Sequence, residues 1–281
     1  MWYHISVQGN KGQSMFWTNK EILHAIDLLG VYSHLHKVDV LAYQFLSNHY
    51  HLIVACDKPT DFMRGFRISY SKYFNYKYNT SGSVGKHQYS CGVISNRTKL
   101  EDRLIYVLRN SVKHGIEEHP YCDPYNSAQY YFFKERNMYE PEKLRIAGKK
   151  YTLNNSNYYI PEHFLLDPGG HIYPRSFLNY KAVENVFKSY SNYLQKISTP
   201  TENEVIANNG KPPTPKKIKI NDLLLSEKIV GLIKPRTILS LDIDEVVSLC
   251  RKFISNHSVS VRQLSRVFGI PETSLRRLLS M

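Results

Sequence analysis

The hydrophobic positions of the first hundred residues follow two periods, one typical of strands and one typical of helices. Residues 2–8 carry apolar side chains at every second position, which predicts a strand. Residues 18–35 carry them at spacings of three and four, which predicts an amphipathic helix. Two further apolar runs, 38–46 and 50–56, are separated by a short polar turn and predict an antiparallel hairpin.

A second helix and a further strand complete this first part of the chain. The helix begins near Pro59, and its apolar residues recur every four positions, which predicts a buried stripe. These are Phe62, Phe66, Tyr70 and Phe74. A strand is predicted over 88–94. The order strand, helix, strand, strand, helix, strand favours the α+β class, with a ferredoxin-like antiparallel sheet and helices.

The next helix has a clear C-terminal end. Leucine, isoleucine and valine recur at helical spacing over residues 100–114, and Gly115 supplies a C-terminal stop. Tyr106 and Asn110 are four residues apart and would share one face of this helix. Beyond it the chain is rich in Tyr, Asn and Pro, and a helix is predicted only over 181–194.

The C-terminal part reads as a linker followed by helices. Residues 203–219 combine Pro, Asn, Gly and Lys and predict an exposed linker. Helices are predicted over 222–233 and 243–254, and residues 259–279 form two short helices joined by Gly269 and Ile270. That layout is typical of a helix-turn-helix, although a helical hairpin without a role in DNA binding has the same pattern. Candidate DNA contacts here are Arg262, Thr273, Ser274, Arg276 and Arg277.

Two histidines flank one tyrosine in the predicted hairpin. In a strand, His49 and His51 lie on one face and Tyr50 on the other. Two neutral imidazoles on one face suit a metal ion, whereas the alternative is a hydrogen-bonded pair at a sheet edge. A second His-x-His, His34 and His36, falls at a helix end, where residues two apart share no face, and we expect those side chains to be solvated or capping.

Charge and aromatic content indicate the class of partner. The chain has 37 Lys and Arg against 24 Asp and Glu, a formal net charge of +13, and 22 Tyr. A basic surface favours a polyanion and flat rings can stack on bases, so nucleic acid is the leading partner, with charge that serves solubility alone as the alternative. Basic residues of the helices that would contact phosphates, or form a solvated face, are Arg64, Arg67, Lys72, Arg109 and Lys113.

Cysteine usage and hydropathy bear on location. The four cysteines are scattered and form no Cys-x-x-Cys pair, so neither a zinc ribbon nor a disulfide framework is expected. The sequence has no apolar run of membrane-spanning length, and its first residues lack the layout of a signal peptide. We therefore expect a cytoplasmic protein with no membrane partner.

Two motifs in this order resemble those of a known family. Residues 49–53, His-Tyr-His-Leu-Ile, and residues 106–115 are similar to the motifs of single-tyrosine HUH transposases, and within them of the REP-associated tyrosine transposases. The second motif of that family reads Tyr-x-x-x-Asn-Pro-Val-(Lys/Arg)-x-Gly. Ser111 stands here where the family usually has proline, which affects the geometry of the helix end.

This resemblance implies an activity and a domain organisation. Tyr106 would attack single-stranded DNA, leaving a 5′-phosphotyrosine link and a free 3′-hydroxyl. His49, His51 and Asn110 would hold Mg²⁺ or Mn²⁺, and the substrate would contain hairpin-forming repeats. The resemblance covers an HUH nuclease domain over residues 1–135. The chain departs from the family's minimal domain after that point, with a Tyr-rich extension (136–200), a linker (201–219) and a helical segment (220–281) that we interpret as an added DNA-binding domain able to bind duplex DNA. The protein would act as a monomer or homodimer.

Other interpretations remain open at this stage. Tyr106 also fits an ordinary packed tyrosine, and Asn110 fits a capping residue. The chain as a whole also fits a non-catalytic DNA-binding regulator derived from the same fold, or a replication initiator or relaxase-like HUH nuclease. No Gly-Lys-Ser/Thr phosphate-binding loop occurs, so an intrinsic helicase is not expected.

Overall fold

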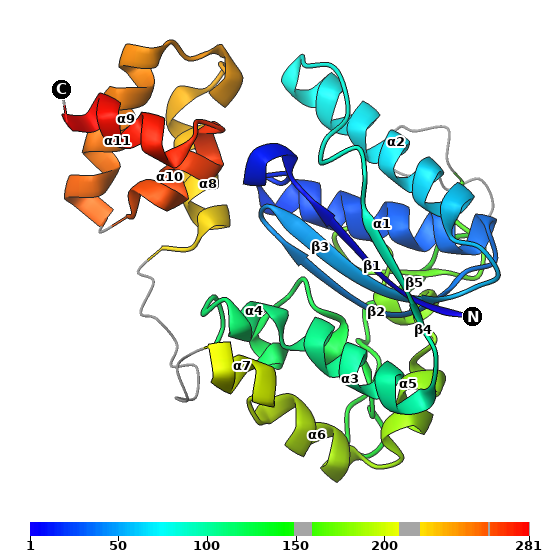
Figure 1. Cartoon of the computed structure of the whole chain (residues 1–281). Helices are drawn as coiled ribbons and strands as arrows, with labels where there is room; N and C mark the ends of the chain where they lie inside the picture. The colour runs from blue at the N-terminus through cyan, green and yellow to red at the C-terminus, as the bar shows by residue number, and fades with distance from the viewer. Residues whose placement is uncertain (149–158, 208–219, 258, 281) are drawn as a thin grey trace.

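The computed structural model describes residues 1–148, 159–207, 220–257 and 259–280, and its centre is a four-stranded antiparallel sheet (Figure 1). The strands lie in the order β2-β3-β1-β4. Their bounds are β1 (Trp2–Gln8), β2 (Asp39–Leu46), β3 (His49–Ala55) and β4 (Ser90–Ile94). The predicted α+β class with an antiparallel sheet is confirmed, and β3 is an internal strand.

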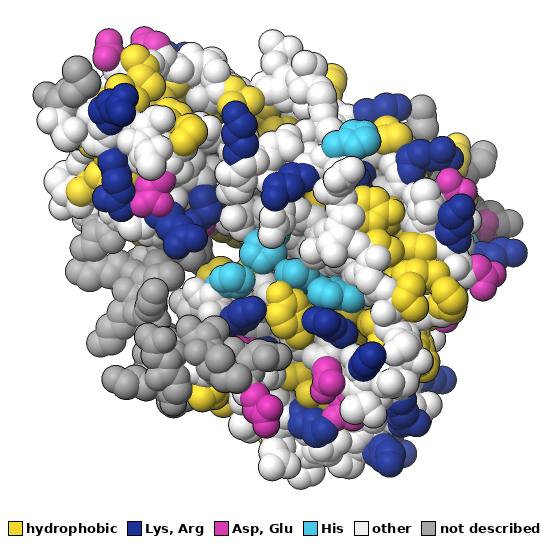
Figure 2. Space-filling view, viewed as in Figure 1, with side chains coloured by type: hydrophobic (Ala, Val, Ile, Leu, Met, Phe, Trp, Pro, Cys, Tyr) yellow, Lys and Arg dark blue, Asp and Glu magenta, His cyan; other side chains and the backbone are white. Residues whose placement is uncertain are grey.

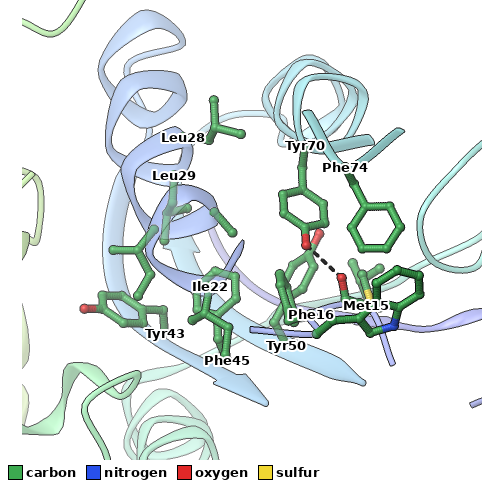
Figure 3. Close-up of a cluster of buried hydrophobic side chains, with 14 of the residues drawn as sticks. Met15, Phe16, Ile22, Leu28, Leu29, Tyr43, Phe45, Tyr50, Tyr70 and Phe74 are labelled. Atoms are coloured by element: carbon green, nitrogen blue, oxygen red, sulfur yellow. Dashed lines mark hydrogen bonds between the residues drawn. The ribbon is translucent and has the colours of Figure 1, made fainter. Parts of the chain in front are cut away.

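Two long helices cover one face of the sheet (Figure 1). They are α1 (Asn19–Leu35) and α2 (Thr60–Tyr78). Between them and the sheet lies an aromatic core, in which Tyr50 of β3 packs against Phe45 and Phe66 (Figure 3). Tyr70 donates a hydrogen bond to the Met15 carbonyl over 2.7 Å, which satisfies its buried hydroxyl. The four-residue stripe of α2 is buried, as its spacing predicts.

A second helical layer covers the opposite face of the sheet. Its helices are α3 (Arg97–Leu108), α4 (Asn110–Lys113), α5 (Tyr180–Phe187) and α6 (Tyr190–Ser198). Leu104 and Leu108 of α3 are fully buried with Ile53 of β3 in a second core. The sheet is therefore covered by helices on both faces, and alternate residues of β1 and β3 enter different cores.

Two of the predicted helices are interrupted. The helix expected over 100–114 breaks at Arg109, which has φ −89° and ψ 5°, and continues as the short α4. Asn126, far along the chain, donates a hydrogen bond to the Leu108 carbonyl over 2.6 Å at this break. The helix expected over 181–194 likewise divides into α5 and α6 at Lys188, whose φ is +65°. Local periodicity did not reveal either interruption.

The segment after α4 closes the β2 edge of the sheet. Gln44 bridges to Asn126, and Val40 bridges to Leu178. A small antiparallel pair, β5 (Arg145–Ile146) and β6 (Leu165–Leu166), lies in the same region. The 3-10 helices of the chain are η1 (Asn10–Gly12), η2 (Pro120–Cys122), η3 (Ser127–Tyr130), η4 (Pro174–Ser176) and η5 (Ile238–Ser240).

Part of the segment expected to be a linker is helical. Helix α7 (Glu202–Ala207) lies where the linker was predicted to begin. Glu204 is buried there and forms an ion pair with Arg109 over 2.7 Å, so this stretch is fastened to the end of α3. The rest of the expected linker, 208–219, lies outside the described residues.

Four helices form the C-terminal unit, as predicted. They are α8 (Asp222–Ile233), α9 (Ile243–His257), α10 (Val261–Phe268) and α11 (Glu272–Ser280). Gly269 ends α10 with φ +69°, a conformation that favours glycine. The unit contacts the N-terminal domain directly, because Gln13 Nε2 donates to the Gly269 carbonyl and Ser14 N donates to the Arg266 carbonyl, each over 2.9 Å.

Among the described residues, no helix has the length and apolar character needed to span a bilayer.

Candidate active site on the histidine-bearing face of the sheet

Strand register gathers histidines on the face of the sheet that α3 covers. His49 and His51 share this face of β3, and Tyr50 lies in the opposite core, as the alternation predicts. In the neighbouring β1, Ser6 pairs with His51, which places His4 diagonally beside it. The ring centroids of His4 and His51 are 5.2 Å apart and those of His49 and His51 are 5.3 Å apart. Figure 2 shows histidines in a row at this surface, with basic side chains nearby.

Tyr106 lies against this row from α3. Its ring meets His51 edge-on at 5.5 Å and His4 at 5.6 Å, measured between centroids. The Lys113 Nζ lies 4.8 Å from the centroid of the Tyr106 ring. Tyr106 is half-buried, so it combines contact with the histidines and access to solvent.

Asn110 and His114 continue the site from α4. Asn110 is completely buried, and its Oδ1 lies 3.0 Å from His49 Nε2. The other amide atom of Asn110, Nδ2, has no hydrogen-bond partner among the residues that the structure describes. His114 packs edge-on against His49 with centroids 5.3 Å apart. The break at Arg109 therefore leaves Asn110 beside Tyr106 on the same site, although one continuous helix was expected.

Burial keeps the imidazoles of the site neutral near pH 7. Desolvation lowers the pKa of His4 and of His114 to about 4. Burial, followed by the neighbouring histidines and Lys113, lowers the pKa of His51 to about 2. The pKa of His49 is lowered by burial, partly offset by its hydrogen bond to Asn110. Neutral imidazole is the form that binds metal ions.

The contacts of His49 fit a cation at Nε2. A neutral imidazole has one N–H, yet both ring nitrogens face amide oxygens: Nδ1 lies 2.8 Å from Asn48 Oδ1 and Nε2 lies 3.0 Å from Asn110 Oδ1. Only one of these contacts is a hydrogen bond in the orientation described; the other places two lone pairs together. Neighbouring ligands on an octahedral cation with bonds of about 2.1 Å are also roughly 3 Å apart. Two arrangements remove the conflict: exchange of the oxygen and nitrogen positions of the Asn110 amide, or a cation shared by His49 and Asn110.

Whether His51 Nε2 has a lone pair free for a metal ion depends on the contact of His51 with His4. His51 Nδ1 lies 3.1 Å from His4 Nε2, and one proton lies between them. If His51 donates, its Nε2 is left with a lone pair that is available to a metal; if His4 donates, that nitrogen carries the proton and is not. His4 therefore decides which tautomer His51 adopts. A set of two imidazoles and one amide oxygen suits Mn²⁺ or Mg²⁺ with further oxygen ligands.

Within the described part of the chain, no group of three or more His, Cys, Asp or Glu side chains has an arrangement suited to a metal ion. The candidate ligands His49, His51 and Asn110 include only two residues of these types, because the side chain of Asn110 is an amide.

The candidate DNA contacts fall in three places. Lys113 belongs to the site. Arg64, Arg67 and Lys72 lie on α2, on the opposite side of the sheet, where Arg67 donates hydrogen bonds to the carbonyls of Lys86 and His87. The C-terminal candidates Arg262, Thr273, Ser274, Arg276 and Arg277 are exposed on α10 and α11, and Arg276 is paired with Glu272 at 2.6 Å.

Arg109 does not fit the expected role in DNA binding. Its side chain is 2% exposed, and its guanidinium donates to both carboxylate oxygens of Glu204 and to the Ile197 carbonyl. Because this guanidinium is buried and paired with Glu204, a phosphate would have to break a buried ion pair to reach it. We therefore remove Arg109 from the candidate DNA contacts and assign it to the anchoring of α7.

Two residues of the site were missed by the sequence analysis. His4 alternates with the apolar residues of β1, so the sequence places it on the face opposite to them. The sequence did not show that β1 pairs with β3, which is what brings His4 beside His51. His114 continues the four-residue spacing of Tyr106 and Asn110, and that signal was present in the sequence.

Comparisons with known proteins add a likeness to a solved structure. No family model matches the sequence, and no curated protein matches it. A solved structure described as a REP-associated tyrosine transposase bound to a REP hairpin is similar to this chain, with 16% identity and a TM-score of 0.40. The match covers 57% of this chain and 92% of that one. Likeness at this level does not define a function, so the proposal below rests on side-chain geometry.

Proposed function

We propose that this protein is a single-tyrosine DNA strand transferase that cleaves single-stranded DNA and conserves the bond energy in a covalent link to Tyr106. The observation that carries the proposal is the convergence of a half-buried tyrosine with neutral histidines and an amide oxygen at one site. A purely structural tyrosine would not need these polar, desolvated neighbours.

Each residue has a chemical role in this proposal. The Tyr106 oxygen attacks the scissile phosphorus; as the new P–O bond forms, the P–O3′ bond breaks, the phenol gives up its proton and the released 3′ oxygen gains one. Lys113, beside the ring, stabilises negative charge on the phenolate and phosphate. His49, His51 and Asn110 would hold Mg²⁺ or Mn²⁺, which supplies charge stabilisation at the phosphate. His4 holds His51 in the required tautomer.

The C-terminal unit would add DNA recognition. Helix α11 exposes Thr273, Ser274 and Arg277 after the turn at Gly269, an arrangement compatible with entry into a major groove. The contacts of Gln13 and Ser14 with this unit place it against the domain that holds Tyr106. Binding of duplex DNA by α11 would then hold single-stranded DNA near the site. Hairpin-forming repeats, which join a duplex stem to single-stranded flanks, are the substrate class we propose.

The decisive experiment is detection of the covalent adduct. Labelled oligonucleotides with a hairpin and single-stranded flanks are incubated with Mn²⁺ or Mg²⁺, and denaturing gels are used to look for protein-linked DNA. We expect an adduct with the wild type, none with Tyr106→Phe, and none after chelation. Tyr50→Phe, which changes the tyrosine on the opposite face, is the matched control and should retain the adduct. DNA binding without an adduct in the wild type would favour the non-catalytic regulator instead.

A further inference from the structure

A cavity adjoins Tyr106 on the side away from the candidate metal ligands. Its volume is about 770 Å³, within the size range of small-molecule sites. Strand β4, helix α3 and the start of α7 form its walls, and Tyr106 and Lys113 lie at its edge. His49, His51 and Asn110 are not among its lining residues. The cavity therefore adjoins the active site and shares Tyr106 and Lys113 with it.

The lining combines three kinds of side chain. Val93 and Ile94 of β4 provide an apolar surface, and Val93 is 61% exposed. The cations are Lys99, Arg103 and Lys113, and the exposed carboxylates are Asp102 and Glu202. Within the described ranges, none of these five charged side chains has an ion-pair partner within the protein. Their charges are available to a ligand.

This combination matches a nucleotide better than a bare phosphate. Cations attract the DNA backbone, and an apolar wall accepts the flat face of a base. Carboxylates would repel phosphate, but they accept hydrogen bonds from the exocyclic amines of cytosine, adenine and guanine, whereas thymine has no such amine. A ligand that satisfies all three surfaces has a phosphate, a flat ring and an amine.

The position of Glu202, one of the two exposed carboxylates of the cavity, is set by contacts within the protein. Glu202 begins α7, and two residues later Glu204 forms its buried ion pair with Arg109, while Thr201 N donates to Glu204 Oε2 over 3.2 Å. Arg109 stands between Tyr106 and Asn110 in the break that positions the site. This buried ion pair fastens the start of α7 to the end of α3, and so holds the backbone of Glu202 beside the cavity.

In-line displacement indicates which nucleoside the cavity would take. The attacking oxygen and the leaving 3′ oxygen lie on opposite sides of phosphorus, so the released strand departs away from Tyr106. The nucleoside on the 5′ oxygen of the same phosphate stays bonded to the tyrosine. We propose that the cavity binds this retained nucleoside and, through Asp102 and Glu202, prefers a base that carries an exocyclic amine over thymine. This inference rests on the proposed function, because it assumes cleavage by Tyr106.

The test is the identity of the base bonded to Tyr106. Hairpin oligonucleotides with randomised flanks are incubated with the full-length protein and Mn²⁺, and the adducts are isolated and sequenced. We expect thymine to be depleted about tenfold at the first retained position of the wild-type adducts, the size expected for one good base contact. Asp102→Asn with Glu202→Gln should reduce this depletion to below about threefold. Asp61→Asn, an exposed carboxylate on α2, is the control and should leave it unchanged.

A second variant tests whether the cavity is filled during cleavage. Val93→Glu adds a negative charge to the apolar wall at an exposed position, so the fold should tolerate it. We expect its adduct yield to fall at least tenfold while Mn²⁺ binding is unchanged. Depletion of thymine that is absent in the wild type, or equal in the wild type and the double variant, would overturn the cavity assignment and leave the tyrosine chemistry intact. Absence of any wild-type adduct would instead refute the proposed function and the assignment that depends on it.

Discussion

On one face of the central sheet, Ile5, Val7 and Leu52 are fully buried under α1 and α2. On the other face, the same strands carry both apolar residues, such as Ile53 in the second core, and polar ones, of which His4 and His51 meet Tyr106. The backbone is shared, so the difference comes from alternation alone. One face stabilises the sheet through apolar burial, and the rigid strands it creates hold the polar side chains of the other at fixed separations.

This division predicts opposite consequences for two neighbouring residues. We expect His51→Ala to lower adduct formation at least about 100-fold, because several kcal/mol of charge stabilisation at the phosphate is lost, while the free energy of unfolding changes little. Leu52→Ala should lower the free energy of unfolding by about 2–5 kcal/mol, because it opens a cavity in the core. Adduct formation per folded molecule should then stay near the wild-type value.

Denaturant unfolding and the gel assay, run on both variants, measure the two effects separately. Loss of adduct formation by the folded fraction of Leu52→Ala, or its retention by His51→Ala, would contradict the assignment of stability to one face of the sheet and of catalysis to the other.

The contact between His4 and His51 predicts a smaller effect, which is confined to metal binding at the site. His4→Ala removes the acceptor for the His51 Nδ1 proton, so we expect Mn²⁺ affinity to fall about 10- to 100-fold. Titration calorimetry measures this, and His4→Gln should recover part of the loss because its side-chain oxygen also accepts a hydrogen bond. Ser6→Ala, two residues along the same face of β1, is the matched control. An affinity unchanged in His4→Ala would show that His51 adopts its tautomer without this partner.

How much of this site was predictable depends on the range of the interactions. Alternation within one strand correctly separated His49 and His51 from Tyr50, because that relation is local. The presence of His4 depended on which strand pairs with β3. The burial of Arg109 depended on Glu204, 95 residues away, and no pattern near Arg109 indicates that partner. The break after Leu108 likewise involves Asn126, 18 residues further on. Local chemistry was visible in the sequence, and long-range partners were not.

The smallest predicted effect concerns a histidine on the other side of the molecule. His24 of α1 stacks on Tyr73 with ring centroids 3.8 Å apart, and burial, followed by His171 and Lys77, lowers its pKa to about 4. Because this folded pKa lies below the unfolded value, the native state resists protonation. The stability that the neutral ring contributes is present above about pH 6.5 and is lost as pH falls toward 4.

Between pH 7 and pH 5.5 the loss should be roughly 1 kcal/mol for this one group. His24→Phe keeps a ring against Tyr73 but does not titrate, so its free energy of unfolding should fall by about 1 kcal/mol less than that of the wild type over the same interval. Urea unfolding at the two pH values measures the difference. Adduct formation at pH 7 should be unchanged, because His24 is buried and neutral like His51 but lies outside the site. Equal pH dependence in the two proteins would mean that His24 does not titrate as its burial implies, and a loss of adduct would mean that α1 contributes to the chemistry.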